Sequence, residues 1–473
     1  MKKLGVFLLF FNSIIYSAWY TGWFYRKVIT NSFAAGGDLT NFPLLVVISN
    51  DTALQSYASN NGYDILFTLK DGTTKLAHEM EYYSNGTIIA WIKIPILSAI
   101  EQDSNIIYMY YNTSSSSDQQ NKNDVWSENY AGVWHLAETS GDASDSTVNA
   151  RTAVNKFATE GNGIYPDGTL DTAALIGSGG HFITNDRLET ASFDLDLPMT
   201  ISAWMMADGT AAYWTSYPGS KAFGGFSRCG QSDAASIWKV SDSSMQTRMT
   251  ILTTNGSGPI ITNTALGKNN QAFSTNQWVY VTMTSDHTQT RAHLNGRNYF
   301  TTNHLYSDLM YKSFSWNIGM GRYSLPTFSY IDECRLSSVA RSTNWLFTEY
   351  TNQIDPVSFR TLGAAETFSG VSFSSITPYS SPCLANENTV FTLNACVITG
   401  TIASVNISWG DGQSSAYTPG IANISTENYS HEYTARNNFS VTAVVTASSG
   451  MAATNSTVIS TLPYRFYNPY NLS

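Results

Sequence analysis

The residues of this chain that could do chemistry are scattered oxygen donors, because the common catalytic motifs are absent from its sequence. There is no H-E-x-x-H pair of metal ligands, no G-x-S-x-G turn for a serine nucleophile and no G-x-x-x-x-G-K-S/T phosphate loop. The histidines never stand at metal-ligand spacing; they occupy positions 78, 135, 181, 287, 293, 304 and 431. We therefore expect most histidines to be structural and the protein to be non-catalytic.

Glycoside hydrolysis is the enzymatic alternative that stays open. It needs two carboxylates roughly 5 to 10 Å apart that face one sugar linkage. The carboxylates of this chain sit singly in predicted turns, and no predicted strand has the E-x-D-x-x-E spacing that directs several of them into one groove. The sequence therefore disfavours a glycosidase, although a β-sandwich fold alone does not exclude one.

Calcium is the metal that the oxygen donors favour. Asp142, Asp145 and Asn149 lie close together in a Gly/Ser-rich loop, and Asp332 and Glu333 are adjacent on a late predicted strand. Hard cations prefer several oxygens from carboxylates, amides and carbonyls. We predict that some of these five residues bind calcium. The alternative is that Asp145 shapes a turn and Asp332 satisfies buried backbone donors.

Three aromatic residues in an irregular Gly/Ser/Pro stretch, Tyr213, Trp214 and Tyr217, are candidates for ligand binding. Flat aromatic faces stack on sugar rings when the side chains are exposed. Three other tryptophans are embedded in apolar runs and are expected in the core: Trp134, Trp204 and Trp278.

Four cysteines are present, and none forms a C-x-x-C pair, so the metal interpretation is weak. Cys383 and Cys396 would close a short loop, and a disulfide there would contribute about 3 kcal/mol by loop-closure entropy. We predict that these two are bridged. Cys229 and Cys334 could pair as well, or they could be two small buried apolar residues.

The N-terminus predicts export. Lys2 and Lys3 precede an apolar run from Leu4 to Ile15, and small residues follow, which is typical of a signal peptide at residues 1–18. The run is shorter than the roughly 17 to 25 residues that span a bilayer, so an uncleaved anchor is the weaker alternative. We expect a secreted, cell-surface protein whose mature chain has no transmembrane helix. N-x-S/T sequons, which predict a glycoprotein, occur at Asn50, Asn85, Asn112, Asn255, Asn406, Asn423, Asn428, Asn438, Asn455 and Asn471.

Composition predicts an all-β chain. At about 150 residues per domain, 473 residues suggest three domains. Charged and aromatic residues each make up 13%, and Tyr, Trp, Val, Ile and Thr suit a pleated, half-buried surface. The net charge of -10, without any block of Lys and Arg, argues against nucleic acid as a partner. We expect tandem β-sandwiches with less than about a tenth of the residues in helices.

The first predicted domain, residues 19–113, is a series of short apolar runs separated by turns. It carries W-x-Y-R-K-x-I-T, N-F-P-L-L-V, N-G-Y-D-I-x-F-T, D-G-T, A-W-I-K-I-P and I-Y-M-Y-Y-N between Trp23 and Asn112. These motifs resemble the domain of unknown function DUF2341. The resemblance implies an extracellular β-domain fused to lectin-like and Ig-like modules, without established catalytic residues. Polar residues 114–124 form a predicted linker.

The second predicted domain, residues 125–366, is similar to the laminin-G-like, concanavalin A-like jelly roll. Its motifs include G-V-W-H-L from Gly132, T-I-S-A-W from Thr200 and Y-I-D-E-C-R-L from Tyr330. The resemblance implies two packed antiparallel sheets, and relatives of this fold often bind calcium. Cys334 stands where valine is typical, so we expect it to face the core. Residues 339–351 form the one predicted helix, which would cap the sandwich.

The third predicted domain, residues 382–462, follows a Ser-rich linker at 367–381. Its W-G-D-G turn at Trp409 and its H-x-Y step at His431 resemble the polycystic-kidney-disease (PKD) domain, an Ig-like sandwich. The resemblance implies a spacer or contact module in which His431 packs or forms hydrogen bonds. The tail, residues 463–473, is too aromatic for a free end, so we expect it to dock on its own chain or on a neighbouring subunit.

Two functions from different classes follow. One is an archaeal-type surface protein that binds glycans or proteins, or adheres through them, by means of its lectin-like domain. The other is a structural subunit of an extracellular filament, sheath or envelope layer that assembles with copies of itself. Low charge and many aromatic residues suit both.

Overall fold

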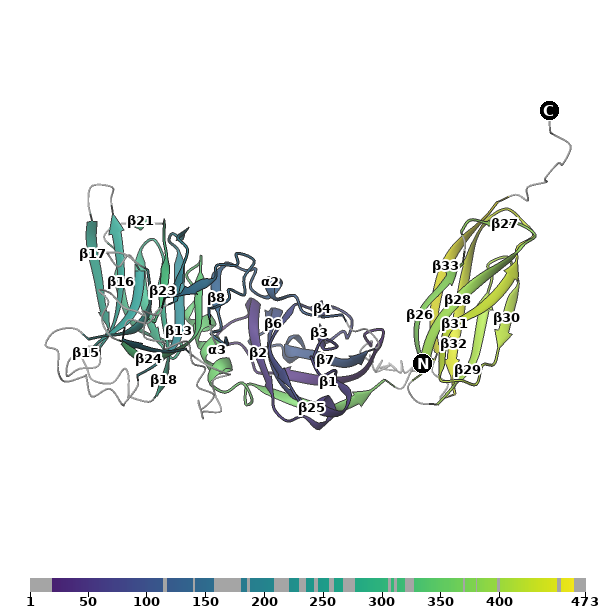
Figure 1. The fold of residues 1–473 in the computed structure, drawn as a ribbon, viewed down its shortest axis with the longest axis horizontal. Helices are drawn as coiled ribbons and strands as arrows, with labels where there is room; N and C mark the ends of the chain where they lie inside the picture. Colours follow the sequence, from purple (N-terminus) through teal and green to yellow (C-terminus); the bar gives the residue numbers. More distant parts are fainter. Residues whose placement is uncertain are drawn as a thin grey trace, which may run out of the picture.

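The computed structural model describes residues 19–113, 117–138, 141–156, 180–184, 188–207, 221–228, 235–241, 246–254, 259–266, 277–304, 308–309, 313–319, 327–368, 371–379, 381–397, 400–448 and 452–462. Strands dominate, arranged in several sheets whose strands pair antiparallel except for β27 with β33, and the all-β prediction is confirmed (Figure 1). The predicted signal peptide and aromatic tail lie outside the described residues.

The first domain consists of two sheets around one core. The five-stranded sheet has the order β25-β1-β7-β3-β4: β25 (Arg360–Thr367), β1 (Trp23–Asn31), β7 (Ile106–Thr113), β3 (Leu66–Leu69) and β4 (Lys75–Leu76). The three-stranded sheet has the order β2-β6-β5: β2 (Leu39–Ile48), β6 (Thr87–Leu97) and β5 (His78–Ser84). Two short helices, α1 (Thr52–Tyr57) and the 3-10 helix η1 (Gln102–Asn105), connect strands.

Alternation of apolar residues explains the strands β2 and β6. Leu44 and Val46 point to the same face because side chains alternate along a strand, and they lie opposite Ile92 and Ala90 on β6. All four side chains are buried in the core between the two sheets.

The last strand of the first domain comes from a distant part of the chain. β25 pairs antiparallel with β1, with Thr361 opposite Thr30, after the chain has passed through the second domain. A Cβ atom at Gly363 would lie 2.3 Å from Cγ1 of Val28, so any side chain at this position would force Val28 to shift. The predicted second unit at 125–366 is therefore wrong in its last segment, because 360–366 completes a sheet of the first domain.

The second domain also has two main sheets. One has the order β10-β24-β13-β18-β19-β20, with β8 beside β24: β10 (Gly180–Thr184), β24 (Thr327–Ser337), β13 (Met199–Ala207), β18 (Trp278–Ser285), β19 (Gln289–Leu294), β20 (Arg297–Asn303) and β8 (Tyr130–Trp134). The other has the order β17-β16-β15-β14-β23-β11-β9, with β21 beside β16: β17 (Pro259–Leu266), β16 (Gln246–Thr254), β15 (Ala235–Ser241), β14 (Lys221–Arg228), β23 (Trp316–Ile318), β11 (Leu188–Thr190), β9 (Ala153–Asn155) and β21 (Asp308–Leu309). The short pair is β12 (Phe193–Asp194) with β22 (Ser313–Phe314).

The core of the second domain lies between its two main sheets. Ile201 and Val281 from one sheet and Trp316 and Ile318 from the other belong to one buried cluster. Cys334 is also in this cluster, so the expectation that it faces the core is confirmed. Trp134 is buried in the same cluster, as predicted.

The helix α3 (Thr343–Ile354) confirms the predicted helix, with a start four residues later than expected. Ser342 caps it, because the Ser342 hydroxyl accepts a hydrogen bond from the backbone N–H of Trp345. The helix covers one face of the sandwich and at the same time lies between the first and second domains (Figure 1). Trp345 and Leu346 enter the core of the first domain.

The opposite face of α3 covers the second domain. Nε1 of Trp204 donates to Oε1 of Gln353 at 2.6 Å, and the hydroxyl of Tyr280 donates to Oε2 of Glu349 at 2.7 Å. Trp204 is thus buried as predicted, but against α3, whereas Trp278 is only partly buried beside it. A Cβ atom at Gly296, in the turn after β19, would lie 2.5 Å from Cα of Phe347. The hairpin is therefore packed tightly on the helix.

The described residues contain three α-helices, of 6, 4 and 12 residues, the second being α2 (Lys122–Val125). None of them is long and apolar enough to cross a bilayer. The predicted low helix content is confirmed for this part of the chain.

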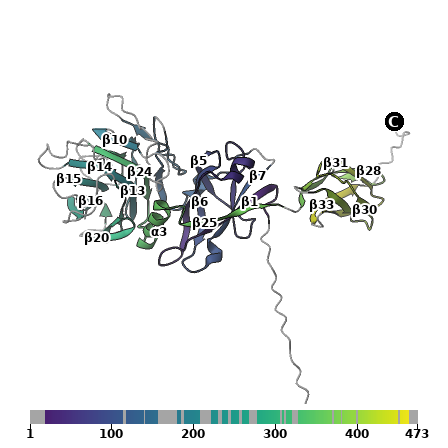
Figure 2. The same ribbon diagram turned by 90° about the horizontal axis from the view of Figure 1, so that it is seen from below.

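The third domain is a sandwich with its own core (Figure 2). Its sheets are β26-β28-β31 and β27-β33-β32-β29-β30: β26 (Val371–Pro378), β28 (Asn388–Val397), β31 (Asn423–Glu432), β27 (Cys383–Leu384), β33 (Ala452–Leu462), β32 (Asn438–Ala447), β29 (Ile402–Ser408) and β30 (Ser414–Tyr417). The ring of His431 stacks on Trp409 at 4.8 Å, and its Nε2 lies 2.7 Å from Oδ2 of Asp411. The predicted structural role of His431 is confirmed.

The predicted bridge between Cys383 and Cys396 is wrong for this structure, because Cys383 is a free, buried thiol. Cys383 lies opposite Thr461 near the end of the sandwich where β28 begins at Asn388. Cys396 lies eight residues after Asn388 on β28. At a rise of about 3.3 Å per residue, it is roughly 26 Å from Asn388 and therefore far from Cys383. A disulfide needs Cα atoms within about 7 Å of each other.

Cys334 is likewise a free, buried thiol, so the alternative interpretation, a small apolar core residue, is correct for it. It is therefore not bridged to Cys229, whose own position lies outside the described residues.

Candidate functional site

The seam between the first and second domains holds a group of buried ionisable side chains. Apolar and aromatic residues surround it: Leu45, Trp91, Val125, Trp126, Tyr130 and Val133. These residues come from β2, β6, α2 and β8 and from the turn after α2, so both domains supply the wall.

A β-bulge in β24 determines which side chains face the seam. Ser202 lies opposite Arg335 and Trp204 lies opposite Asp332, so Glu333 and Cys334 together face Ala203 alone on β13. A bulge of this kind changes the direction of the side chains that follow it. Glu333 has a φ of +50°, a left-handed conformation that side-chain-bearing residues rarely adopt.

The bulge places two acids and a base on one face of β24. Cys334 faces the core, as do Ile331 and Leu336 on either side. Asp332 and Glu333 are consecutive, and a regular strand would point one of them into the core. Both are instead part of the buried group at the seam, together with Arg335.

Arg335 is the buried cation of the group. Its guanidinium carbon lies 4.3 Å from the ring centre of Trp91 and 4.9 Å from that of Trp126, two cation-π contacts. It forms ion pairs with Oε2 of Glu333 at 2.6 Å and Oε1 of Glu349 at 2.5 Å. Arg335 therefore connects β24 to helix α3 and to both tryptophans.

His135, just after β8, is surrounded by three glutamates. Its Nδ1 lies 2.8 Å from Oε1 of Glu333 and 3.8 Å from Oε2 of Glu81, and its Nε2 lies 3.3 Å from Oε2 of Glu79. Burial alone would lower the pKa of His135, but the three carboxylates raise it well above its ordinary value. The imidazole is therefore charged at neutral pH in this arrangement.

Glu79 on β5 is held as a carboxylate. Burial would raise its pKa, yet His135 and hydrogen-bond donors lower it to about 2. Nε1 of Trp126 and Oγ of Ser146 each donate to Glu79 at 2.6 Å. This residue connects strand β5 to the second domain.

The pKa values of Glu81 and Asp332 are raised, whereas the pKa of Glu79 is lowered. Burial raises the pKa of Glu81 to about 8, and the neighbouring charge of Glu333 adds to this effect. Burial also raises the pKa of Asp332 well above its ordinary value. Nε1 of Trp91 donates to Oε2 of Glu81 at 2.9 Å. Carboxyl groups whose pKa values are pushed apart in this way are typical of acid and base pairs in active sites.

Burial argues against acid-base catalysis on a glycan here. The side chains of Glu81, Glu333 and His135 are only 5%, 6% and 8% exposed, between two domains. Glycoside hydrolysis requires both carboxyl groups to contact the same sugar linkage, and a polysaccharide cannot reach groups enclosed to this extent.

The structure does not bring the five predicted calcium ligands together. Asp145 is buried and accepts four hydrogen bonds, from the backbone N–H groups of Val133, Thr147 and Arg151 and from the Thr147 hydroxyl. This arrangement favours the alternative interpretation, in which Asp145 shapes a turn. Asp332 likewise accepts a hydrogen bond from the backbone N–H of Glu333.

The other two predicted ligands have separate neighbours. Oδ1 of Asp142 accepts from the backbone N–H of Asn155, and Nδ2 of Asn149 donates to the carbonyl of Ala131. Of the five, only Asp332 and Glu333 lie together at the seam. Calcium binding by the second domain stays a prediction.

The predicted surface sites are only partly described. Tyr213, Trp214 and Tyr217 lie outside the described residues. Five sequon asparagines are exposed: Asn50, Asn85, Asn406, Asn428 and Asn438. Asn112 and Asn455 are partly buried, and the side chains of Asn255, Asn423 and Asn471 are not described. Glycosylation stays a prediction.

Sequence reasoning missed four members of the buried group: Glu79, Glu81, His135 and Arg335. One signal was available, since Glu79 and Glu81 stand two residues apart, a spacing that would place both on one face of a strand. The approach of His135 to this strand depends on how two domains dock, which no local pattern reveals.

Two family models match the chain. Residues 61–150 match DUF2341, a domain of unknown function, and residues 177–346 match Laminin_G_3, of the concanavalin A-like lectin/glucanases superfamily. Both resemblances seen in the sequence are thus supported, but the DUF2341 match runs through the predicted linker to residue 150. It includes Glu79, Glu81 and His135, while Glu333 lies in the other match. A comparison with curated proteins gives no match.

Solved structures of low sequence identity resemble parts of the chain. Domain 4 of AbnA, a GH43 extracellular arabinanase from Geobacillus stearothermophilus, in complex with arabinotriose, is 13% identical; the match covers 46% of this chain and 97% of that one, with a TM-score of 0.31. The botulinum neurotoxin serotype D binding domain is 10% identical, with coverage of 68% and 73% and a TM-score of 0.34. The PKD1 domain of Vibrio anguillarum Epp is 15% identical, with coverage of 20% and 96% and a TM-score of 0.16.

Proposed function

We propose that this protein works outside the cell as a non-catalytic binding protein, and that its lectin-like domain holds a glycan. The observation that carries the proposal is the match of residues 177–346 to the concanavalin A-like lectin/glucanases superfamily, in a domain with one of its two sheets committed to an internal contact. The other sheet is then the one left for a ligand.

The internal contact is made by the sheet that contains β13, β18 and β24. Trp204 and Tyr280 on this sheet are fully buried and bonded to Gln353 and Glu349 of α3. A sugar could reach this face only if the helix and the first domain moved away. We therefore assign the glycan to the opposite sheet.

The opposite sheet lies at the far end of the molecule. Strands β15, β16 and β17 are on the side of the second domain away from α3 and the first domain (Figure 1). The predicted ligand residues Tyr213, Trp214 and Tyr217 belong to the connection between β13 and β14, which joins the two sheets. In this proposal they contribute stacking faces for the sugar rings.

In this proposal the first domain fixes the orientation of the lectin-like domain. Helix α3 and strand β25 return from the second domain into the core and the sheet of the first, so the lectin-like domain is held at both its ends. Domains joined through a large apolar contact do not move independently. The third domain then acts as a spacer or as a contact with other surface components.

Glycan binding is tested with the full chain on immobilised polysaccharides and oligosaccharides. We expect Trp214→Ala to weaken binding by about tenfold or more, since one aromatic stacking contact is worth roughly 1 to 3 kcal/mol. The matched control is Tyr379→Ala, because Tyr379 is 87% exposed on the third domain. We expect the control to bind as the wild type does.

Two results would contradict the proposal. One is release of reducing ends from a bound polysaccharide, which would make the protein an enzyme. The other is the absence of binding to any glycan together with formation of long assemblies visible by electron microscopy. That second result would support the alternative, a structural subunit of a filament or an envelope layer.

A further inference from the structure

We propose that Glu81, His135 and Glu333 bind one divalent transition-metal ion, with zinc as the best fit, at the seam between the first and second domains. The ion would connect the two domains, because Glu81 lies on β5 of the first domain and Glu333 on β24 of the second. This site is separate from the proposed glycan site and does not depend on it.

The geometry of the donor atoms supports one shared ion. A carboxylate oxygen of Glu81, a ring nitrogen of His135 and a carboxylate oxygen of Glu333 all lie within 4.8 Å of one another. Zinc binds nitrogen and oxygen at about 2.0 to 2.2 Å, so its tetrahedral ligand atoms lie about 3.4 Å apart. Small rotations of the side chains are enough to reach that spacing.

A further buried carboxyl, that of Asp332, lies near these three, although its oxygens are not among the atoms that lie within 4.8 Å of one another. Asp332 is only 1% exposed, and within the described part of the chain no hydrogen bond reaches its Oδ2 atom. The bulge in β24 places this carboxyl beside Glu333, where the charges of Glu333 and Glu81 act on it. A buried carboxylate oxygen without a donor is costly, and coordination to a cation would remove that cost.

The surroundings of His135 suit a metal ligand. Its Nε2 faces Oε2 of Glu79 at 3.3 Å, while Nδ1 faces Glu81 and Glu333. A metal ion would displace the proton from Nδ1, while the proton on Nε2 stays donated to Glu79; the freed lone pair on Nδ1 would then be directed toward the other two glutamates. A carboxylate that holds the far nitrogen of a ligating histidine is a common feature of zinc sites.

The donor set favours a transition metal over calcium or magnesium. Calcium takes six to eight oxygen ligands, and magnesium keeps several waters. Here one imidazole and two carboxylates approach one another among buried side chains, and one further ligand, such as a water molecule, would complete four-coordinate zinc. Arg335 neutralises the second oxygen of Glu333, so one oxygen of that carboxylate remains for the ion.

The test measures metal binding by the full chain. Protein freed of metal by a chelator is titrated with Zn²⁺ and, in parallel, with Ca²⁺, and metal stoichiometry is read by native mass spectrometry and affinity by calorimetry. We expect one Zn²⁺ per chain, with much weaker binding of Ca²⁺. Co²⁺ should give visible absorption bands typical of a four-coordinate site.

Matched variants locate the site. We expect His135→Gln to abolish the one-to-one complex and Glu81→Gln, which keeps the shape of the side chain, to weaken it by about tenfold or more. The control is His287→Gln, because His287 is an exposed histidine of the second domain. If His135→Gln does not fold, Glu81→Gln and the wild type decide. No Zn²⁺ binding by the folded wild type, or unchanged binding in Glu81→Gln, would overturn the proposal.

Discussion

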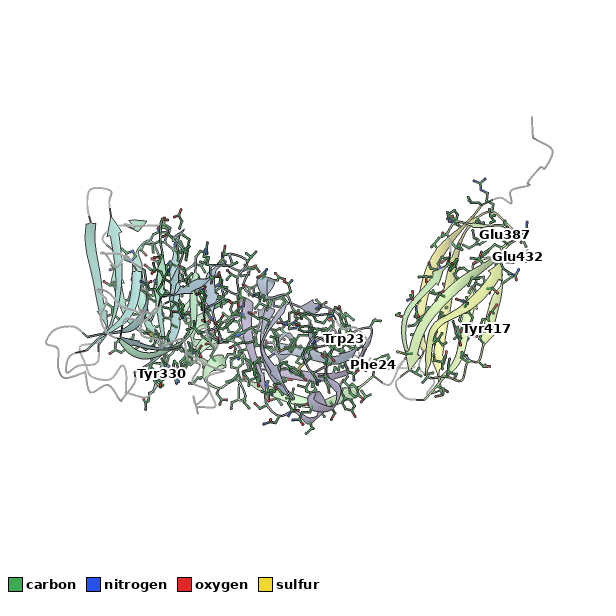
Figure 3. All side chains as sticks on the ribbon, viewed as in Figure 1. Trp23, Phe24, Tyr330, Glu387, Tyr417 and Glu432 are labelled. Carbon is green, nitrogen blue, oxygen red and sulfur yellow. The ribbon has the colours of Figure 1, made fainter. Side chains whose placement is uncertain are left out.

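The seam between the first and second domains and the join to the third domain are built differently. At the seam, the core of the first domain includes Trp345, Leu346 and Phe359, which follow the second domain in the chain. Within the part of the chain that the structure describes, the core of the third domain, by contrast, draws on residues 371 to 459 alone. At that join the backbone N–H of Phe368 donates to the carbonyl of Phe24, at the end of the first domain that faces the third (Figure 3).

This difference determines which domains unfold together. Domains without a common buried contact can unfold separately, whereas domains that share a buried cluster and a helix lose stability together. Each of the first two domains has its own main core, but both contribute to the apolar cluster at the seam, and α3 packs on both. The first two domains are therefore one folding unit and the third is another. A lectin-like domain in such a unit presents its free sheet at a fixed orientation to the first domain.

The largest expected effect comes from truncation. A chain that ends at residue 342 lacks α3 and β25, so the first domain loses three large core side chains, each worth about 2 to 5 kcal/mol. We expect this chain to lose the fold of the first domain, while a chain that ends at 367 keeps it. Thermal unfolding followed by circular dichroism compares the two, and equal melting temperatures would contradict the shared core.

A single substitution at the seam also tests whether the first two domains unfold together and separately from the third. Arg335→Met keeps much of the side-chain volume but removes the cation from buried Glu349 and leaves Glu333 with His135 alone. Removing one partner of a buried pair costs about 3 to 5 kcal/mol. We expect urea unfolding to show this loss in the first two domains only. The control, His431→Gln, should affect only the third domain.

The sequence alone predicted those strands and turns that depend on local residue patterns. Alternating apolar residues marked β2 and β6, and the motif containing Trp409 identified the turn of the third domain. The H-x-Y step predicted that His431 packs or forms hydrogen bonds, and the structure shows it stacked on Trp409. These features succeed because the interacting residues are close in the sequence or fixed by the strand period.

The remaining features depend on long-range contacts or on a broken period. β25 pairs with β1, and no pattern within β25 indicates which edge it will join. The strand period places Asp332 and Glu333 on opposite faces, but the bulge at Glu333 brings them together. The predicted Cys383–Cys396 bridge failed because spacing in sequence said nothing about the direction of β28.

A smaller effect is expected from pH. His78 is buried against Phe67, and burial, aided by the charge of Lys75 and opposed by that of Asp118, lowers its pKa to about 4. The unfolded histidine takes up a proton near pH 6.5, so stability is complete above that pH and falls as the pH drops toward 4. The loss is about 3 kcal/mol.

Urea unfolding at pH 7 and pH 4.5 measures this effect. We expect His78→Leu to reduce the difference between the two pH values in the transition of the first two domains, while the third domain is unchanged. An equal pH difference in wild type and variant would show that other groups cause it.

The most direct test of the shared folding unit is differential scanning calorimetry of the full chain, with hydrogen exchange to assign each transition. We expect two cooperative transitions, one for the first and second domains together and one for the third. Three separate transitions, with the first domain still protected from exchange while the second is unfolded, would contradict it.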